Sequence, residues 1–318
     1  MSLRRFILKR LLSIVPILFG VSVITYTLVH FTPGDPVSQM LAMNPDATAA
    51  DAAQLRARYG LDQPVWKQYL TWMSNVLTGD FGRVISSNRP VADVVVGRLP
   101  ETIALGLFGW AFGMLIAIPT GIYAAVHKDE LGDTVSRFIA LSGISLPNFW
   151  LGLMLMLLAA VWLDLWPVKA PREPLYHPRM LKFLVLPGLT IGASSAATLM
   201  RIMRSSMAEE LNKEYVMAAR AKGLPERTVI LKHVLRNSLI SVATVAAFLT
   251  SSIVAGSVVV EQVFRWPGLG EAFINAITGR EINLIMAITL FTGVAIILAN
   301  LLADVAYALL DPRIRDEY

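Results

Sequence analysis

The sequence predicts an all-α integral membrane protein with six transmembrane helices and a helical extracytoplasmic loop of about 65 residues between the first two. The chain of 318 residues is 55% hydrophobic, with a mean hydropathy of +0.58. Only 16% of it is charged, against roughly 25% in an ordinary soluble domain. Six uncharged stretches approach or exceed the roughly 20 apolar residues that a bilayer-crossing helix needs. Backbone groups in hydrocarbon must be hydrogen-bonded within their segment, so these runs are helices, and the alternating pattern of a β-barrel is absent.

The uncharged runs set the order of the elements. The predicted organisation is an N-terminal segment (1–10), a first span (11–34), a loop (35–99), a second span (100–126), a third (135–163), a fourth (183–204), a polar loop (205–237), a fifth span (238–260), a sixth (282–308) and a C-terminal segment (309–318). Pro187 and Gly188 interrupt the fourth run. The first run follows four basic residues, as a signal peptide would, but Thr32–Pro36 is not a small-x-small cleavage site, which favours an uncleaved anchor.

The distribution of basic residues predicts that both termini lie in the cytoplasm. Six spans put both termini on one side, and that side would hold sixteen Lys and Arg residues against six in the short outer loops. The remaining six lie in the long loop, which counts little for orientation. Four of the outer basic residues fall in the loop 164–182, which is the weakest point of this topology.

The long outer loop contains two predicted helices. Residues 47–59 form the first, with Asp46 or Thr48 at its start and Gly60 at its end. The second covers residues 64–77. One face of this second helix carries Val65, Tyr69, Trp72, Met73 and Val76. Trp66, Tyr69 and Trp72 suit a membrane interface. The loop is either a lid or docking surface on the outer face, or a cover that packs over helix ends.

The polar loop between the fourth and fifth spans is unusually basic. Residues 214–237 contain five Lys or Arg residues, with Lys213 just before them. A helix is predicted from Glu210 to Lys222, ended by Gly223, and a second short helix begins at Pro225. Small residues at 218, 219, 221 and 223 permit close backbone approach, and a basic rim surrounds them. This combination suits insertion into a partner's groove, although an ordinary solvated cytoplasmic loop has a similar composition.

The same stretch resembles the signature loop of ABC-transporter permease subunits. That pattern is Glu-Ala-Ala, three residues, Gly, nine residues, Ile-x-Leu-Pro. When the stretch is aligned on Gly223, the two alanines of the pattern correspond to Ala218 and Ala219, and its leucine corresponds to Leu235. Three positions depart from the pattern, namely Met217, His233 and Arg236 in place of Glu, Ile and Pro.

Motifs elsewhere resemble one branch, the dipeptide/oligopeptide/nickel permeases, and specifically the first permease of the operon. These motifs are ArgSerSerMet (204–207), TyrValMetAlaAlaArgAlaLysGly (215–223), HisValLeuArgAsn (233–237), ProGlyAspPro (33–36), TyrGlyLeuAspGlnPro (59–64), GlyAspPheGly (79–82), SerLeuProAsnPheTrp (145–150), PheArgTrpProGlyLeuGly (264–270) and AspProArgIleArg (311–315). This branch often has a Pro shortly after the Asn, and Leu239–Ser241 has none. The resemblance covers nearly the whole chain.

The resemblance implies the permease subunit of a type I ABC importer in the prokaryotic plasma (inner) membrane, with residues 98–309 as its permease domain. A second permease subunit would complete the pathway for di- or oligopeptides, two cytoplasmic ABC ATPases would bind below, and an extracytoplasmic solute-binding protein would deliver cargo. Nickel, oligosaccharides and opine-like compounds are alternative cargoes. The residues implied in ATPase coupling are Glu214, Tyr215, Ala218, Ala219, Arg220, Lys222 and Gly223. An external gate is expected at Trp266, Pro267, Gly268 and Gly270, unless that segment is a simple interfacial turn.

The chain is not expected to be an enzyme. It has no Gly-Lys pair, so it lacks a P-loop, and it has no His-Glu-x-x-His or Gly-x-Ser-x-Gly motif. Because the chain has only four scattered His and no Cys, no metal or cofactor is expected. The expected surroundings are membrane lipid, and no nucleic-acid partner is expected. An ion-coupled carrier is the rival class, but its intramembrane ionisable groups are missing from the second through sixth runs. Asp304 comes closest, with Asn300 on its face, and is expected near the headgroups.

Overall fold

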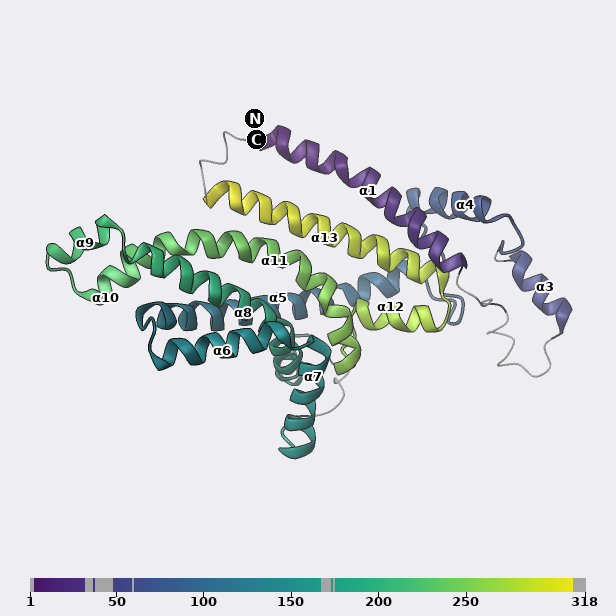
Figure 1. The fold of residues 1–318 in the computed structure, drawn as a ribbon. Coiled ribbons are helices and arrows are strands. Elements are labelled where there is room, and N and C mark those ends of the chain that lie inside the picture. The colour runs from purple at the N-terminus through teal and green to yellow at the C-terminus, as the bar shows by residue number, and fades with distance from the viewer. Residues whose placement is uncertain are drawn as a thin grey trace. The chain divides into compact units, whose positions relative to one another are not determined.

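The computed structural model describes residues 3–31, 37, 48–58, 60–166, 173 and 175–310, and these are almost entirely helical (Figure 1). Within that part of the chain there is no strand, only one isolated bridge between Arg83 and Pro90. The helices are α1 (Leu3–Phe31), α3 (Ala49–Arg58), α4 (Val65–Leu77), α5 (Val91–Val126), α6 (Leu131–Ser145), α7 (Asn148–Met156), η1 (Leu157–Trp162), α8 (Pro178–Glu210), α9 (Glu214–Ala221), α10 (Glu226–Thr228), η2 (Val229–Val234), α11 (Leu235–Phe264), α12 (Leu269–Thr278) and α13 (Ile282–Leu310). The motifs at 33–36 and 311–315 lie outside the described residues, as does Tyr59.

Five described helices are long and apolar enough to cross a membrane, and a sixth span results if the bent pair α6 and α7–η1 is counted as one. This confirms the predicted all-helical membrane protein. The third span, however, is not the single helix predicted for 135–163. Its two parts meet at 104° around Leu146 and Pro147. Proline disfavours the helical conformation of the residue before it, and Leu146 accordingly has an extended ψ of 129°.

Several boundaries differ from the prediction because packing extends the helices. α5 begins at Val91 rather than at residue 100, since this added stretch buries Val91 and Val95 in a cluster with α12 and α13. α8 starts at Pro178 and continues to Glu210, and Pro187 does not interrupt it. The predicted helix from Glu210 to Lys222 is therefore two elements, because its first residue ends α8 and α9 starts only at Glu214.

The chain divides into two compact units. The first comprises residues 1–7, 103–266 and 296–318, and in it α8 contacts α6, α7 and α11. A Cβ added to Gly192 on α8 would lie 2.6 Å from the Gly109 carbonyl oxygen, and one added to Gly113 would lie 3.1 Å from the Gly192 carbonyl oxygen. The backbones of α5, which carries Gly109 and Gly113, and of α8 are therefore in direct contact. Gly109 and Gly113 allow this close packing of α5 on α8, and Gly106 is buried on the same helix.

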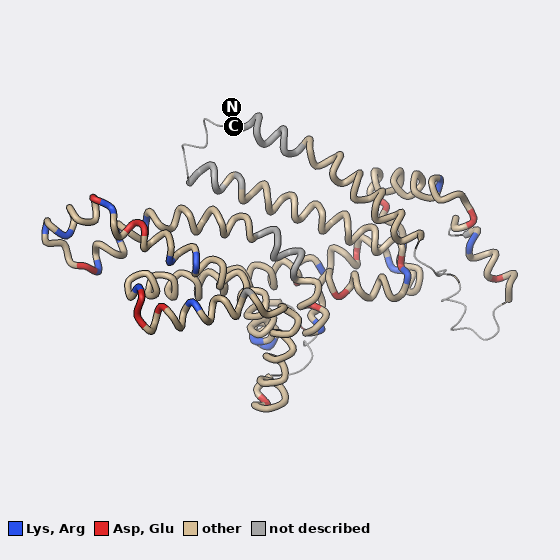
Figure 2. The backbone as a smooth tube through the Cα atoms, in the orientation of Figure 1, with Lys and Arg blue, Asp and Glu red and all other residues tan. Residues whose placement is uncertain are grey.

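Charges of this first unit gather at one end of its helix bundle. Figure 2 shows them around α9, α10 and the connection between α5 and α6, while the helices beyond carry few. Asp133 and Arg204, on α6 and α8, form a two-point ion pair near this end, with both N–O distances 2.6 Å. The two loops that the topology assigns to the cytoplasm therefore lie at the same end of one compact unit.

The second unit comprises residues 8–102 and 267–295. Thr48 caps α3 through reciprocal hydrogen bonds with Asp51, which confirms one of the two predicted caps and lowers the pKa of the Asp51 carboxyl. Four residues of the predicted face of α4 pack inward, namely Tyr69, Trp72, Met73 and Val76, with Trp72 against Tyr26 and Met286. Val65, the fifth residue of that face, is exposed, as is Trp66. The inner face of α4 therefore covers other helices of the second unit, while Trp66 lies on its exposed face.

Candidate functional site

The helix α9 projects from the end of the first unit, between the end of α8 and the start of α10 (Figure 1). It ends in a motif that requires glycine. The Gly223 N–H donates to the Arg220 carbonyl at 2.9 Å, and the Leu224 N–H donates to the Ala219 carbonyl at 3.4 Å. This is the Schellman pattern, which needs a left-handed residue, and Gly223 has φ +74°. The predicted helix end at Gly223 is confirmed.

The start of α9 is tied to both neighbouring helices by a polar network. The Tyr215 hydroxyl donates to the Glu210 carboxylate at 2.5 Å, and the Asn237 amide donates to the Tyr215 hydroxyl at 3.1 Å. Lys213 forms a close ion pair with the same carboxylate. Burial and the hydrogen bond to Glu210 raise the pKa of the Tyr215 phenol, so this hydroxyl stays protonated and donates at neutral pH. Tyr215 is thus a link between α8, α9 and α11.

The turn after α9 is closed by an ion pair. Arg220 donates to both carboxylate oxygens of Glu226, at 3.1 and 2.6 Å. Arg220, expected at a partner interface, is therefore engaged within its own loop. Pro225 lies one position before α10 rather than at its first residue. The predicted second short helix is not separate either, because α10 continues through the π-helical segment η2 into α11.

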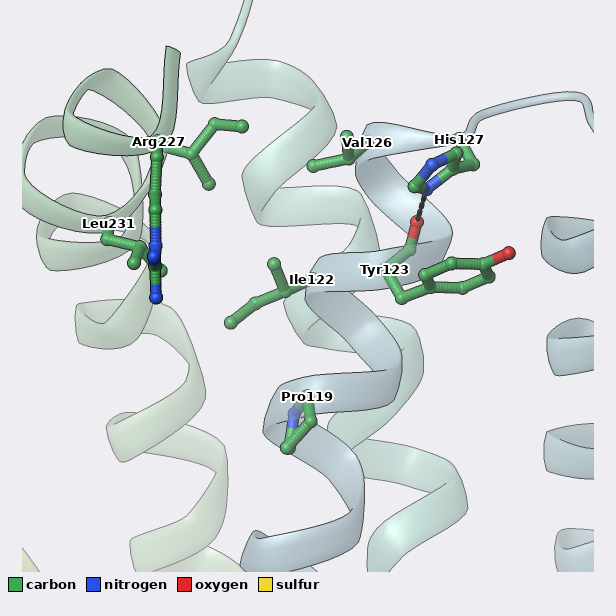
Figure 3. Close-up of a pocket in the computed structure, with 8 residues that line it drawn as sticks. Pro119, Ile122, Tyr123, Val126, His127, Arg227 and Leu231 are labelled. Atoms are coloured by element: carbon green, nitrogen blue, oxygen red, sulfur yellow. Dashed lines mark hydrogen bonds between the residues drawn. The ribbon is translucent and has the colours of Figure 1, made fainter. Parts of the chain in front are cut away.

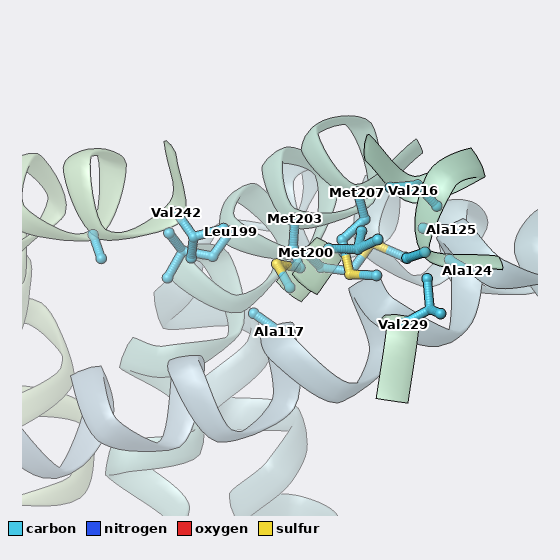
Figure 4. Packing of buried hydrophobic residues seen from close by; sticks show 13 residues of the cluster. Ala117, Ala124, Ala125, Leu199, Met200, Met203, Met207, Val216, Val229 and Val242 are labelled. Atoms are coloured by element: carbon cyan, nitrogen blue, oxygen red, sulfur yellow. The ribbon is translucent and has the colours of Figure 1, made fainter. Parts of the chain in front are cut away.

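The small residues of α9 face two different ways. Val216 and Ala219 are buried against Met203 and Met207 of α8 and Val229 of η2 (Figure 4). Ala219 was expected to contact a partner protein, but its side chain is only 8% exposed. Its small size instead allows α9 to pack closely against the helix bundle. The outer side is formed by exposed residues, namely Glu214, Met217, Ala218, Lys222, Gly223 and Leu224.

These contacts make α9 a braced projection with a small, partly apolar and basic outer surface. Its inner side packs in the core, its two ends are tied by hydrogen bonds and an ion pair, and its tip is a glycine turn with open space around Gly223. Such a surface can dock into a groove of another protein, but it holds no arrangement for chemistry. No group of three potential metal ligands occurs among the residues that the structure describes.

An open groove adjoins this loop within the first unit (Figure 3). Its lining is mainly apolar, with Pro119, Ile122 and Val126 from the end of α5 opposite Leu231 from η2. His127 also lines it, and its ring nitrogen Nδ1 lies 3.1 Å from the Tyr123 carbonyl oxygen. Tyr123 and Arg227 add a hydroxyl and a positive charge to this mainly apolar lining.

The four predicted gate residues do not share one role. In the first unit, Trp266 is fully buried and stacks on Phe183 with ring centroids 6.2 Å apart, and Arg265 before it has a left-handed φ of 53°. In the second unit, Pro267 and Gly268 lead into α12, and Gly270 is the second residue of that helix. Arg98 donates to the Gly268 carbonyl at 3.3 Å and pairs with Glu271 at 2.9 Å. Thr102 accepts the Leu269 N–H at 2.7 Å. The segment is therefore a firmly held turn.

Comparison with known proteins decides the family. Residues 117–316 match the family described as the binding-protein-dependent transport system inner membrane component, and residues 3–106 match the N-terminal component of such systems. The chain belongs to this family of ABC-transporter permeases.

Two relatives support the assignment, and one solved structure shares the fold. The permease is 37% identical over 316 residues to the oligopeptide transport system permease protein AppB of Bacillus subtilis (strain 168), covering 97% of this chain and 98% of that protein. It is 39% identical over 310 residues to the glutathione transport system permease protein GsiC of Escherichia coli (strain K12), covering 98% of each. The MetNI methionine ABC transporter shares its fold, with a TM-score of 0.57 at 16% identity over 69% of this chain and 96% of that one.

Sequence reasoning placed the permease's loop but missed what holds it. The contacts of Glu210 and Asn237 with Tyr215 were not predicted, and neither was that of Asp133 with Arg204. The Asp133–Arg204 pair joins residues 71 positions apart, and no local pattern relates them. For Glu226, the spacing of six from Arg220 across a Gly-x-Pro turn is a usable sequence signal for an ion pair.

Proposed function

We propose that this permease forms one half of the translocation pathway of an ATP-driven importer and receives the force of ATP hydrolysis through α9. The observation that carries the proposal is the braced form of α9. Its inner side is packed into the first unit through Ala219, while Ala218, Lys222 and Gly223 face outward. A projection anchored in this way moves together with α8 and α11, so a push on its outer surface tilts the helices.

The other parts of the machine are separate subunits. Because the chain has no Gly-Lys pair, it has no P-loop, and two cytoplasmic ABC ATPases would hydrolyse ATP. One of them would grip α9. A second permease subunit would form the other half of the pathway within the membrane lipid, and an extracytoplasmic solute-binding protein would deliver cargo. The proposed external gate comprises Trp266, Pro267, Gly268 and Gly270.

The topology follows the same proposal. Both termini and the loop with α9 face the cytoplasm, in a prokaryotic plasma (inner) membrane, because sixteen basic residues then lie inside. The six spans are those predicted from the uncharged runs, with the third bent at Pro147. The outer loop, including α3 and the exposed Trp66, would face the solute-binding protein.

Di- or oligopeptides are the proposed cargo. Relatives covering almost the full chain are named as oligopeptide and glutathione permeases, which supports cargo with peptide bonds over nickel, oligosaccharides or opine-like compounds. The neighbouring genes, or mass spectrometry of the ligand on the co-purified receptor, would separate these cargoes.

Reconstitution tests the proposed function. The chain would be purified with its second permease and its ATPases, placed in sealed vesicles with the loaded receptor outside, and assayed for uptake of the receptor's ligand. Uptake is expected only with ATP at the ATPase side. Concentration of the solute by the chain without any ATPase would overturn the proposal in favour of an ion-coupled carrier.

A further inference from the structure

A tight hairpin in the second unit ends at the first residue of α5, and we call residues 79–91 the outer hairpin. Gly79, Gly82 and Asn88 have positive φ values, which close it sharply. Its two arms are joined by the hydrogen bond from the Val84 N–H to the Arg89 carbonyl at 2.9 Å and by that from the Val91 N–H to the Gly82 carbonyl at 3.0 Å. The outer hairpin is thus a rigid element within a long loop.

The outer hairpin is held from below by a buried carboxylate. Glu281, immediately before α13, is 5% exposed and accepts the backbone N–H groups of Ile85 at 2.5 Å and Ser86 at 2.8 Å. Asn283, on the first turn of α13, donates to the Arg83 carbonyl at 3.2 Å. Hydrogen bonds to a charged acceptor in a dry site are among the strongest that a protein makes. The hairpin is therefore clamped to α13 across 196 residues of sequence.

Apolar packing continues the same connection. Val84 and Val91 of the outer hairpin are buried in one cluster with Leu284 and Ile288 of α13. The tip is different, because its residues 86–90 are exposed and polar or proline. The outer hairpin therefore packs against α13 through its buried valines, while its tip is exposed to solvent.

We propose that Glu281 is a positioning residue that fixes the outer hairpin to α13, so that a load placed on the hairpin by a docked solute receptor reaches α13. The inference rests on the proposed function, because it needs a receptor and a coupled ATPase. The receptor docks on the polar tip of the hairpin, where the Arg89 side chain is exposed, and not on the buried side. Glu281 does not touch the cargo.

The substitutions Glu281→Ala and Glu281→Gln test the clamp. The readout is the ratio of ATP hydrolysis with loaded receptor to hydrolysis without it, in the reconstituted full complex. Alanine removes the acceptor, and the ratio is expected to fall about tenfold, as for loss of hydrogen bonds to a charged group. Glutamine offers only one acceptor oxygen, so its ratio is expected to lie in between. Glu130→Gln, at an exposed carboxylate of the α5–α6 connection, is the matched control and should keep the wild-type ratio.

A disulfide tether separates this role from a general loss of stability. A Cβ built on Gly82 would lie 3.7 Å from the Asn283 Cβ, and disulfides have Cβ–Cβ distances of about 3.8 Å. The chain has no cysteine, so a Gly82→Cys/Asn283→Cys pair can be oxidised selectively. The positive φ at residue 82 strains a cysteine equally in both redox states, so oxidised and reduced samples of one protein can be compared directly.

The tether is added to the Glu281→Ala variant. Oxidation is expected to restore the stimulation ratio to the wild-type value, and reduction is expected to return it to the lowered value of Glu281→Ala. The inference is overturned if Glu281→Ala keeps the wild-type ratio, or if the oxidised tether fails to restore it. If the alanine variant cannot be purified, Glu281→Gln takes its place with the same two outcomes. Failure of the proposed function is distinct, because the wild-type complex itself would then show neither ATP-dependent uptake nor receptor stimulation.

Discussion

Arg220 and Glu226 bridge the turn after α9, with the guanidinium donating to both carboxylate oxygens at 3.1 and 2.6 Å. Their side chains are 43% and 53% exposed, so the pair is screened by water and contributes only about 0.2–1 kcal/mol to stability. Its importance lies in its position. It joins the last turn of α9 to the start of the helical path into α11, so it makes the projection behave as one body.

The first prediction concerns this brace. Arg220→Glu or Glu226→Arg alone places like charges across the turn, and the number of solutes taken up per ATP should fall by about twofold to fivefold. The double reversal restores the attraction and should recover most of the loss. Uptake and ATP hydrolysis would be measured together in proteoliposomes. A double variant as poor as the singles would show that the two residues act through a partner's charges and not through each other.

The second prediction uses Gly223, whose φ of +74° and open surroundings separate backbone conformation from charge. Asn and Asp have nearly the same shape and both tolerate the left-handed region. Gly223→Asn should therefore retain most uptake, whereas Gly223→Asp should abolish it by placing a carboxylate in the docking surface, with both proteins inserted normally. Membrane content by immunoblot and uptake would be compared. Normal uptake by the aspartate variant would mean that this turn is not the docking surface.

The third prediction contrasts two adjacent alanines. Ala219 is 8% exposed within the core cluster, whereas Ala218 lies on the outer side. Ala219→Glu buries an unpaired charge, which costs several kcal/mol, and should lower the melting temperature of the purified permease. Ala218→Glu should leave the melting temperature unchanged but reduce co-purification of the ATPase subunits. Equal melting temperatures for the two variants would contradict the inward placement of Ala219.

Hydropathy located the spans because it is a local property, and some helix ends followed from local signals in the same way. Thr48 and Gly223 are examples, since a cap and a left-handed turn act within a few residues. Pro147 was also a usable signal for the bend in the third span. By contrast, α5 begins at Val91 because α12 and α13 cover that stretch, and these helices lie far away in sequence.

The candidate site shows the same limit. Residue size predicted that α9 makes close contacts, but only the packing of Met203 and Met207 decides that Ala219 faces in and Ala218 faces out. The role of Glu281 could not be predicted from the sequence for a related reason. Its partners are backbone N–H groups of Ile85 and Ser86, and a backbone donor has no signature in the sequence.

The last prediction concerns the ion pair of Asp133 and Arg204, which connects α6 to the helix that leads into the loop. The Asp133 side chain is fully buried and Arg204 is 18% exposed, so removing one partner leaves the other charge poorly solvated. Breaking a buried pair in this way typically costs about 3–5 kcal/mol. Asp133→Ala should therefore lower the melting temperature strongly in detergent, and Arg204→Ala should do the same.

Arg137 provides the control, because it lies 3.4 Å from the same carboxylate but is 51% exposed. Arg137→Gln should change stability by less than about 1 kcal/mol. The double replacement Asp133→Leu/Arg204→Met removes both charges and should recover much of the lost stability, since the apolar pair needs no compensation. If the double variant also regains uptake, the ion pair acts only as a strut between α6 and α8. If it regains stability but not uptake, the loop depends on the angle at which that ion pair holds α8, because the apolar pair fills the same space without fixing that angle.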